Sequence, residues 1–398
     1  MRYLSIGSQY EAAEELKRVG VDPYGITAMI PKMKNINILL EGIECKVANI
    51  LKQEMLSCGG DVAVARGSVE CSIEKTDALI IGTIKQVKAL VDKISLQPFG
   101  LKRISADLKN LLGNLTREGF VVKTPRREIP LEKKTLLMGV INVTPDSFSD
   151  GGIFANVDEA VEYGIRMEGD GADIIDVGGE SSRPGSDPVS TEEEMRRVIP
   201  VIESLGKRVT VPLSIDTTKS EIARIALDAG AEIVNDISAL RFDENMAATV
   251  AHYKVPVILM HMRGTPKTMQ EGDLTYSSLR SDIMGFLEER IEAALSVGIE
   301  RDAIIVDPGI GFGKTSEDNI RLLKYLEEFK GLGRPILIGT SRKGFIGRTT
   351  GGEVKDRLAG TAATVTAAIL KGANVVRVHD VGFMKKVAVM ADAIKNVQ

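Results

Sequence analysis

The sequence predicts an α/β fold, a (β/α)8 TIM barrel preceded by a small α+β domain. From about Leu136 onward, a short apolar strand, a polar residue and an amphipathic helical stretch follow one another eight times, which is the pattern of such a barrel. The chain has 398 residues, whereas a (β/α)8 barrel needs about 250. Because the surplus precedes the repeats, we expect two domains, residues 1–125 and 126–398.

The N-terminal domain combines helical and strand patterns, with a turn signal at Gly59-Gly60 between two of its elements. Residues 36–55 fit either one long helix or a strand followed by a helix. The other predicted helices are Tyr10–Val19, Ile84–Ile94 and Lys102–Leu112, and the predicted strands are Asp61–Ala65 and Asp77–Ile81.

We expect an accessory or oligomerisation role for this domain, because its sequence shows no cluster of nucleophile, base and orienting group. A second catalytic activity is the alternative. The segment KTPRREIPLEKK (123–134) contains two prolines and many charges. That composition is typical of a linker into the barrel.

Each predicted barrel strand is followed by amide, carboxylate, hydroxyl or cationic side chains. The loops after the strands of such a barrel meet on one face and build the active site. A single residue of this kind is explained by a helix cap or a surface ion pair, but eight sets together predict a functional rim. The predicted strands are Leu136–Val140, Asp173–Val177, Pro212–Ile215, Glu232–Val234, Val255–Met260, Ala303–Val306, Pro335–Ile338 and Val375–Val376.

Composition favours small-molecule ligands. The net charge of −4, from 51 basic and 55 acidic residues, offers no sustained basic face for nucleic acid. No apolar run approaches the roughly 20 residues that span a bilayer, and the first residues lack the apolar core of a signal peptide. The three cysteines match no metal or redox spacing. We therefore expect a cytoplasmic protein with reduced thiols.

Four rim residues are suited to a flat heterocycle. A buried carboxylate such as Asp216 or Asp307 can accept a pair of hydrogen bonds from the adjacent donors of an amino-pyrimidinone, as found in a pterin. The amide of Asn235 can both donate and accept beside it. Met260 offers a polarisable surface for a ring face, although core packing is the more common fate of a methionine.

The remaining rim residues are suited to an anionic leaving group. A departing diphosphate needs several cations and a metal ion. Asn142 offers a neutral oxygen for Mg²⁺, an ion that keeps water and phosphate oxygens as its other ligands. Arg377 and His379 alternate along one strand, so their side chains point the same way. The cationic set is Arg183, Lys343, Arg377 and His379.

Eight motifs, taken in order, resemble those of the dihydropteroate synthase family, which joins 6-hydroxymethyl-7,8-dihydropterin diphosphate to p-aminobenzoate and releases diphosphate. They span essentially the whole predicted barrel: MGVINVTPDSFSDGG (138–152), DVGGESSRPGS (176–186), SIDTTK (214–219), VNDI (234–237), VILMHMRGTP (257–266), DPGIGFGK (307–314), TSRKGFIG (340–347) and RVHDV (377–381).

The resemblance implies a role for each rim residue. Asn142 would bind Mg²⁺ with the diphosphate, Arg377 and His379 would bind the leaving group, and Arg183 would order the second loop. The pterin would be held by Asp216, Asn235, Asp307 and Lys343. The p-aminobenzoate pocket would be formed by Phe148, Asp150, Pro184 and Lys343. The expected catalytic residues are Asp150, Asp216, Lys343, Arg377 and His379.

Two positions depart from the common family pattern. Ser182 stands where many members have threonine, and it keeps the hydroxyl. Gly344 stands where some members have a serine that contacts the aminobenzoate carboxylate. We therefore expect backbone N–H groups at the helix start to make that contact.

Two rival functions are compatible with a pterin-binding barrel. A methyltransferase that acts on a methylated folate and a corrinoid protein would not need the pair Arg377 and His379. A non-catalytic pterin-binding protein would be expected to lack the loop residues Phe148, Asp150 and Arg183, which are present. The sequence therefore favours the synthase, with a homodimer that uses the last two helices as the expected assembly.

Overall fold

The computed structural model describes residues 2–117, 119–131, 134–143 and 157–397. The chain forms two compact units, residues 1–116 and 117–397. The division falls before the boundary expected at residues 125 and 126.

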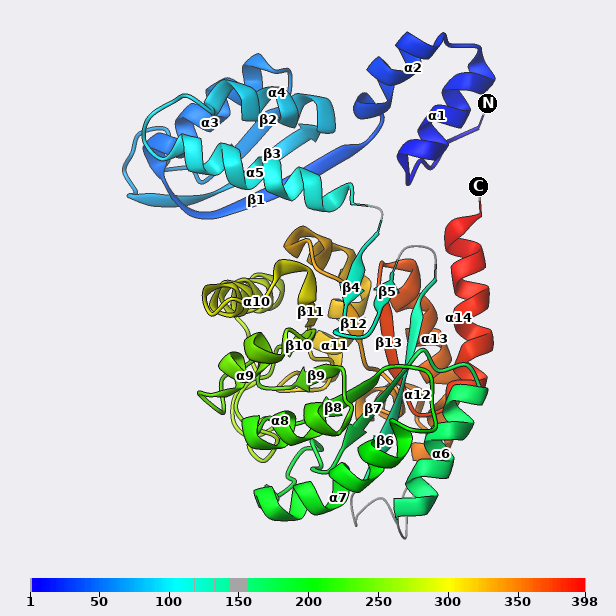
Figure 1. Ribbon diagram of the computed structural model, residues 1–398. Helices are drawn as coiled ribbons and strands as arrows, with labels where there is room; N and C mark the ends of the chain where they lie inside the picture. The colour runs from blue at the N-terminus through cyan, green and yellow to red at the C-terminus, as the bar shows by residue number, and fades with distance from the viewer. Residues whose placement is uncertain (1, 118, 132–133, 144–156, 398) are drawn as a thin grey trace. The chain divides into compact units, whose positions relative to one another are not determined.

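The N-terminal unit has one antiparallel sheet with strand order β1-β3-β2 and helices packed against it (Figure 1). The pattern at residues 36–55 resolves as a strand followed by a helix, and the other predicted helices and strands are present. The elements are α1 (Gln9–Val19), α2 (Pro23–Met29), β1 (Asn35–Glu44), α3 (Cys45–Ser57), β2 (Asp61–Val64), β3 (Lys75–Thr83), α4 (Ile84–Ile94) and α5 (Leu101–Leu115), with a 3-10 turn at Ile30–Lys32.

The sequence explains this unit locally. Side chains along β3 alternate between exposed and buried, as a sheet with one covered face requires. Thr83 caps α4 and forms a capping box with Gln86, which satisfies backbone N–H groups at the helix start. Buried apolar residues from β1, α3, β3, α4 and α5 form a single core.

The second unit is a parallel (β/α)8 barrel, as predicted (Figure 1). Its strand order is β11-β10-β9-β8-β7-β6-β13-β12, and a parallel bridge between Val306 and Ile336 joins the two ends of the sheet. The strands are β6 (Leu136–Asn142), β7 (Ile174–Gly178), β8 (Leu213–Asp216), β9 (Ile233–Asp236), β10 (Val257–Met260), β11 (Ile304–Asp307), β12 (Leu337–Ile338) and β13 (Val375–Val378).

Helices follow the strands and cover the outside of the barrel. They are α6 (Val157–Gly169), α7 (Thr191–Leu205), α8 (Ser220–Ala229), α9 (Met246–Tyr253), α10 (Leu279–Ser296), α11 (Ser316–Lys324), α12 (Gly344–Thr350), α13 (Leu358–Leu370) and α14 (Val381–Asn396), with 3-10 turns at Arg301–Ala303, Leu326–Leu332 and Val354–Arg357. Within the described ranges, no helix is long and apolar enough to cross a membrane.

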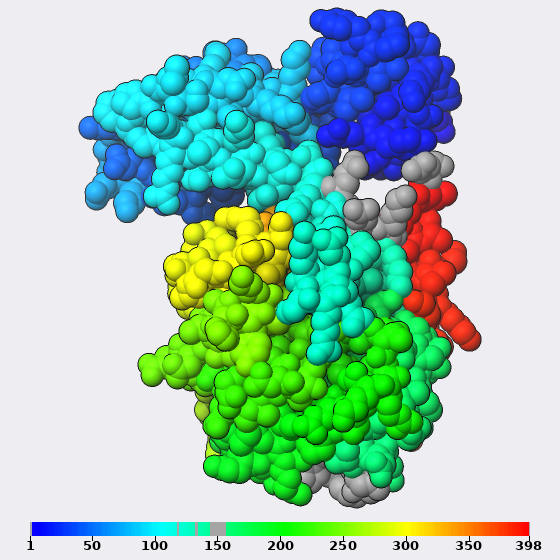
Figure 2. Space-filling view, viewed as in Figure 1, coloured from blue at the N-terminus to red at the C-terminus, as the bar shows by residue number. Residues whose placement is uncertain are grey.

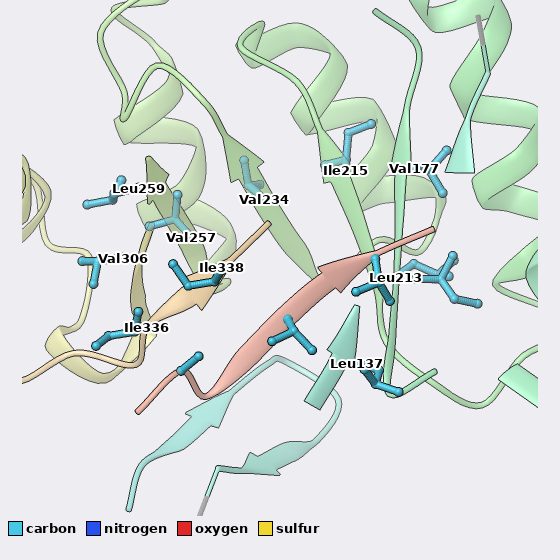
Figure 3. Close-up of a cluster of buried hydrophobic side chains, with 14 of the residues drawn as sticks. Leu137, Val177, Leu213, Ile215, Val234, Val257, Leu259, Val306, Ile336 and Ile338 are labelled. Atoms are coloured by element: carbon cyan, nitrogen blue, oxygen red, sulfur yellow. The ribbon is translucent and has the colours of Figure 1, made fainter. Parts of the chain in front are cut away.

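Alternate residues of each barrel strand contribute to two different cores. In β10, Val257 and Leu259 face the helices, whereas Ile258 belongs to the cluster inside the barrel. Figure 3 shows residues of the helix-facing set, including Val257 and Leu259 on β10. Because parallel barrel strands are apolar on both faces, a polar residue within one needs a specific explanation.

The predicted linker is wrong in its first part, since residues 121–130 form a β-hairpin of the barrel unit. Strands β4 (Val121–Lys123) and β5 (Glu128–Pro130) pair antiparallel. Val122, Ile129 and Leu131 are buried with the inward-facing residues of the barrel strands. Figure 2 shows this segment, in cyan-green, against the green body of the barrel. The hairpin therefore closes the amino-terminal end of the barrel, and we call it the plug.

Candidate active site

A cavity of about 800 Å³ opens at the carboxyl ends of the barrel strands. It brings together residues from loops that are far apart in the sequence, as expected for the rim of such a barrel. Seven of the predicted site residues line it: Asn142, Ser182, Arg183, Pro184, Lys343, Arg377 and His379.

Arg377 is the centre of a buried ionic network beside this cavity. Its Nε donates to Oδ2 of Asp176, and its Nη2 donates to Oδ2 of Asp216, both at 2.6 Å. The amide Nδ2 of Asn235 donates to the same Asp176 oxygen at 3.0 Å. The network therefore joins two predicted residues, Asp216 and Asn235, to the cavity through Arg377.

The network contains two carboxylates for one guanidinium. The side chain of Asp176 is fully buried, and that of Asp216 is 14% exposed. Burial raises the pKa of Asp216 to about 7, although Arg377 opposes this shift. Burial alone would lower the pKa of Arg377, but Asp176 and Asp216 raise it. Arg377 therefore stays charged, and Asp216 can take up a proton near neutral pH.

Asp307, the last residue of β11, and Lys343, on the loop after β12, form a second polar group. The backbone N–H of Gly309 donates to Asp307 Oδ1 at 2.7 Å. A side chain at Gly309 would place its Cβ 1.9 Å from the His261 carbonyl oxygen, so only glycine allows this close approach. The Nζ of Lys343 donates to the Ile310 carbonyl and lies 4.2 Å from the centre of the Phe312 ring.

Burial affects both charged groups of this second site. It raises the pKa of Asp307, while the Gly309 N–H and Lys343 oppose the shift. Burial lowers the pKa of Lys343 to about 8, although Asp307 raises it. A lysine in this state is ready to donate to a carbonyl or ring nitrogen of a ligand.

Met260 is 4% exposed and lies beside the cavity in an apolar cluster with Met262, Met269 and Phe312. Two members of that cluster, Met269 and Phe312, line the cavity themselves. Met260 pairs in register with Asp307 on the neighbouring strand. The structure thus places Met260 next to Asp307, in a packed environment.

The buried Lys314, which also lines the cavity, connects the glycine-rich loop after β11 to the residue that follows β10. Its Nζ lies 2.8 Å from Nδ1 of His261 and donates to the carbonyls of Gly309 and Phe312. Burial lowers the pKa of Lys314 well below its usual value, and burial and Lys314 lower that of His261 to about 2. His261 is therefore neutral, and its Nδ1 can accept a hydrogen bond from Lys314.

His379 is held by the loop after β12. Its backbone N–H donates to Ser341 Oγ at 3.2 Å, and its Nδ1 lies 3.0 Å from the same oxygen. The Tyr163 hydroxyl donates to the His379 carbonyl at 3.1 Å. Burial, Arg377 and Arg342 lower the pKa of His379 to about 3, so the imidazole is neutral at pH 7.

The second loop carries Ser182, Arg183 and Pro184 to the mouth of the cavity. Lys219 holds the start of this loop, since its Nζ contacts Oε2 of both Glu180 and Glu194 at 2.5 Å. Glu194 is 1% exposed, and burial raises its pKa against the effect of Lys219. In this loop, Glu180 therefore supports the chain, whereas Ser182, Arg183 and Pro184 line the cavity.

Two predicted residues, Phe148 and Asp150, lie outside the described residues. Asn142 is the last residue of β6 and lines the cavity. Within the described part of the chain, no group of three or more histidine, cysteine, aspartate or glutamate side chains is gathered for a metal ion. Asn142 offers a neutral amide oxygen at the cavity, a donor that Mg²⁺ accepts beside water and phosphate oxygens.

Sequence reasoning assigned no specific role to Asp176, Ser341 or Lys314. Asp176 lies inside the apolar run of β7, where a carboxylate is unfavourable unless it is paired. The cost of burying an unpaired carboxylate inside a strand is the signal that could have identified Asp176 from the sequence. Ser341 and Lys314 lie within motifs that were recognised, but only the folded chain shows their contacts with His379 and His261.

The closed barrel and its polar rim define an α/β-barrel enzyme with buried carboxylates beside a cationic cavity. Residues 138–379 match the family described as pterin binding enzyme, and the chain belongs to that family. It is 48% identical over 264 residues to the dihydropteroate synthase of Synechocystis, a match that covers 66% of this chain and 91% of the relative.

Two further comparisons concern the barrel and the additional unit. A dihydropteroate synthase structure from Xanthomonas albilineans with 4-aminobenzoic acid is 43% identical, with a TM-score of 0.65, and covers 70% of this chain and 100% of that one. A probable bifunctional folylpolyglutamate synthase/dihydropteroate synthase of Halobacterium salinarum is 38% identical over 377 residues, 94% of this chain and 45% of the relative. The latter match extends into the N-terminal unit.

Proposed function

We propose that this protein is a dihydropteroate synthase, a transferase of folate biosynthesis. It condenses 6-hydroxymethyl-7,8-dihydropterin diphosphate with p-aminobenzoate and yields 7,8-dihydropteroate and diphosphate. The observation that supports this best is the juxtaposition at Arg377. One side of this residue pairs with buried carboxylates, and it lines a cavity together with His379 and Lys343.

The pterin would be bound by the polar groups next to this cavity. Asp307 and Asp216 supply buried carboxylate acceptors, and Asn235 supplies an amide whose orientation is set by its bond to Asp176. Lys343 would donate to the ring from the opposite loop. Met260 would support the ring face through the apolar cluster.

The diphosphate would lie at the cationic part of the cavity. Arg377 would donate to its oxygens, and His379 would contribute a neutral imidazole. Asn142 fits as the protein ligand of a Mg²⁺ ion that is shared with the diphosphate. Such an ion, when bound, would neutralise the charge of the leaving group.

We infer a dissociative displacement at the exocyclic methylene carbon. The bond from this carbon to the diphosphate oxygen breaks, and the electron pair leaves with the diphosphate. Electron release from the reduced pterin and the carboxylate of Asp216 stabilise the cation that develops. The amine nitrogen of p-aminobenzoate then forms the new bond and loses one proton to solvent. No strong general base is needed, because an aniline nitrogen is neutral near pH 7.

The p-aminobenzoate would bind towards the mouth of the cavity. Pro184 and Lys343 line this region, and Phe148 and Asp150 of the first loop are proposed to complete the pocket. Ser182 would contribute a hydroxyl, and Arg183 would order the second loop over the ligand. Helix α12 begins at Gly344, so its first N–H groups would receive the carboxylate.

The assay that tests this function follows dihydropteroate and diphosphate together. Purified protein is incubated with the pterin diphosphate and Mg²⁺, with and without p-aminobenzoate, and products are separated by chromatography. We expect product only when both substrates and the metal are present. Tight pterin binding without product would contradict the synthase function, and methyl transfer from methyltetrahydrofolate would then be tested.

We also propose that the protein is a cytoplasmic homodimer. The outer face of α14 exposes Phe383, Met390 and Ile394, which are 47%, 61% and 49% exposed. Apolar side chains gathered on one helix face favour contact with another protein surface. A second copy of the chain, packed through α13 and α14, would bury them.

A further inference from the structure

The hydroxyl group of Ser341 contacts two nitrogens of His379. The backbone N–H of His379 donates to Ser341 Oγ at 3.2 Å, and the ring nitrogen Nδ1 lies 3.0 Å from the same oxygen. Ser341 is 6% exposed. Ser341 borders the cavity, but little of its surface is exposed, so contacts with these protein groups dominate the surroundings of its hydroxyl.

The position of the ring proton follows from the hydrogen bonds that Ser341 can make. A serine hydroxyl donates once and accepts through two lone pairs. If Nδ1 carried the ring proton, Oγ would accept from both nitrogens, and its own O–H would have no acceptor among the described residues. If Nδ1 is bare, the O–H donates to it and every polar atom of the contact is satisfied. The second arrangement is favoured, since a buried donor without an acceptor is costly.

The imidazole carries a single proton at neutral pH. Burial, Arg377 and Arg342 lower the pKa of His379 to about 3, so the doubly protonated ring is not populated at pH 7. A neutral histidine has one donor nitrogen and one acceptor nitrogen, and the partner of one nitrogen decides the role of the other.

We propose that Ser341 is a positioning residue that holds His379 in the Nε2–H tautomer, so that the imidazole offers a hydrogen-bond donor to the departing diphosphate. The part of this inference that concerns diphosphate rests on the proposed function. His379 lines the cavity beside Arg377 and Lys343, and its Nε2 has no hydrogen-bond partner among the described residues. In the other tautomer, a lone pair at Nε2 would face the anion and repel it.

Neighbouring contacts hold Ser341 in place. Arg342 has a φ of 58°, a left-handed conformation that is unfavourable for a residue other than glycine. Its Nε and Nη2 donate to the two carboxylate oxygens of Asp380 at 3.1 and 2.6 Å. Its backbone N–H donates to Thr361 Oγ1, and its carbonyl accepts from Arg357. The loops after β12 and β13 are thus joined at two successive positions, Ser341 to His379 and Arg342 to Asp380.

The tautomer can be read directly, because the chain contains 3 histidines. We would label the full-length protein with ¹⁵N-histidine and record long-range ¹H–¹⁵N correlation spectra without ligand at pH 7. His379→Gln assigns the His379 signals, and His261, whose Nδ1 faces Lys314, serves as an internal reference. We expect Nε2–H for His379 in the wild-type protein. A wild-type spectrum of the Nδ1–H form would overturn the proposal.

Variants at Ser341 give the matched comparison. Ser341→Ala removes the hydroxyl and should produce a mixture of tautomers at His379 with His261 unchanged, whereas Ser341→Thr keeps the hydroxyl and should retain Nε2–H. An unchanged tautomer in a folded Ser341→Ala protein would also overturn the proposal. If that variant does not fold, Ser341→Cys, whose thiol is a weaker donor than the hydroxyl, replaces Ser341→Ala in the comparison.

Binding of inorganic diphosphate tests the functional consequence. By titration calorimetry, Ser341→Ala should weaken diphosphate binding about fivefold, as expected for the loss of one hydrogen bond, whereas Ser341→Thr should stay near wild type. Equal affinity in all three proteins would contradict the donor role. The spectra require no turnover, so they remain decisive even if the protein made no dihydropteroate. That result would refute the proposed function separately.

Discussion

Arg377 balances the charge of two buried carboxylates while its other side lies at the cavity. Charged groups that lose their partner inside a protein are strongly destabilising. Because Asp176 has no exposed side-chain surface and Asp216 is 14% exposed, a change at Arg377 must affect stability as well as activity. A test of its role has to separate the two effects.

Arg377→Ala should weaken transition-state stabilisation by about 2–4 kcal/mol, by analogy with the loss of one preorganised donor. We therefore expect a lower kcat/KM. The substitution should also lower the free energy of unfolding by about 3–5 kcal/mol. The double variant Arg377→Ala/Asp176→Asn should recover part of this stability but none of the activity. Steady-state kinetics and urea unfolding measure both quantities, and near wild-type kcat/KM in either variant would refute the role in leaving-group departure.

Asp216 should make stability depend on pH. Its pKa is about 7 in the folded protein and about 4 in an unfolded chain. Between these values the native state binds more protons than the unfolded state, so the free energy of unfolding falls as pH rises. Asp216→Asn should therefore lose less stability than the wild type between about pH 5 and 7, measured by urea unfolding.

A control for this pH effect is available on the surface. Asp187 is exposed and paired with Lys267, and this pair lowers its pKa below the usual value. Asp187→Asn should therefore leave the pH dependence of the free energy of unfolding between about pH 5 and 7 unchanged. If the free energy of unfolding changed with pH in the same way for the wild type and Asp216→Asn, the raised pKa of Asp216 would be contradicted.

At the scale of the element, the plug shows what sequence patterns reveal and what they miss. The barrel strands were predictable because each is an apolar run with a polar residue at its end. Strands β4 and β5 are only 3 residues long, and charges and prolines surround their few apolar residues. Their role depends on Val122 and Ile129 reaching the inward-facing residues of the barrel, a tertiary contact that no local pattern encodes.

Ile129→Ala should lower the free energy of unfolding by about 2–5 kcal/mol, because it leaves a cavity between the plug and the barrel. The KM values should not change, since the plug lies at the end of the barrel away from the cavity. Lys123→Ala on the exposed side of the hairpin should change stability by less than about 0.5 kcal/mol. Thermal or urea unfolding compares the variants, and equal stability would contradict the role of the plug.

The candidate site also contains residues that a sequence pattern reveals and residues that it misses. Residues at strand ends, such as Asn142 and His379, could be identified because the barrel topology brings all strand ends to one rim. Asp176 could not be singled out in this way, because it lies inside a strand and acts through Arg377. Its contact with Arg377, like that between Lys314 and His261, is visible only when distances between distant segments are known.

At the scale of the whole molecule, the chain combines a complete catalytic barrel with a second compact unit. The synthase relative from Synechocystis is covered over 91% of its length by a match to 66% of this chain. The barrel therefore corresponds to a protein that exists without the N-terminal unit in another organism. Each unit has its own buried core, which favours independent folding.

A protein of residues 117–398 should fold and keep kcat/KM within about twofold of the full chain. If the full chain forms the proposed dimer, the shortened protein should form it too, because the exposed apolar face of α14 belongs to the barrel unit. Light scattering after gel filtration and steady-state kinetics, applied to both proteins, provide the measurements. A dimeric full chain with a monomeric shortened protein would assign dimerisation to residues 1–116, and an inactive folded barrel would show that catalysis requires them.

The plug covers the amino-terminal end of a barrel whose interior is filled by apolar side chains. The cavity, at the other end, therefore opens on the side of the loops that follow the strands. Asn235, which is 5% exposed, lies deeper than the exposed Arg183 and Pro184. Under the proposed function, the pterin would pass the place where p-aminobenzoate is proposed to bind, so p-aminobenzoate that bound first would obstruct the pterin.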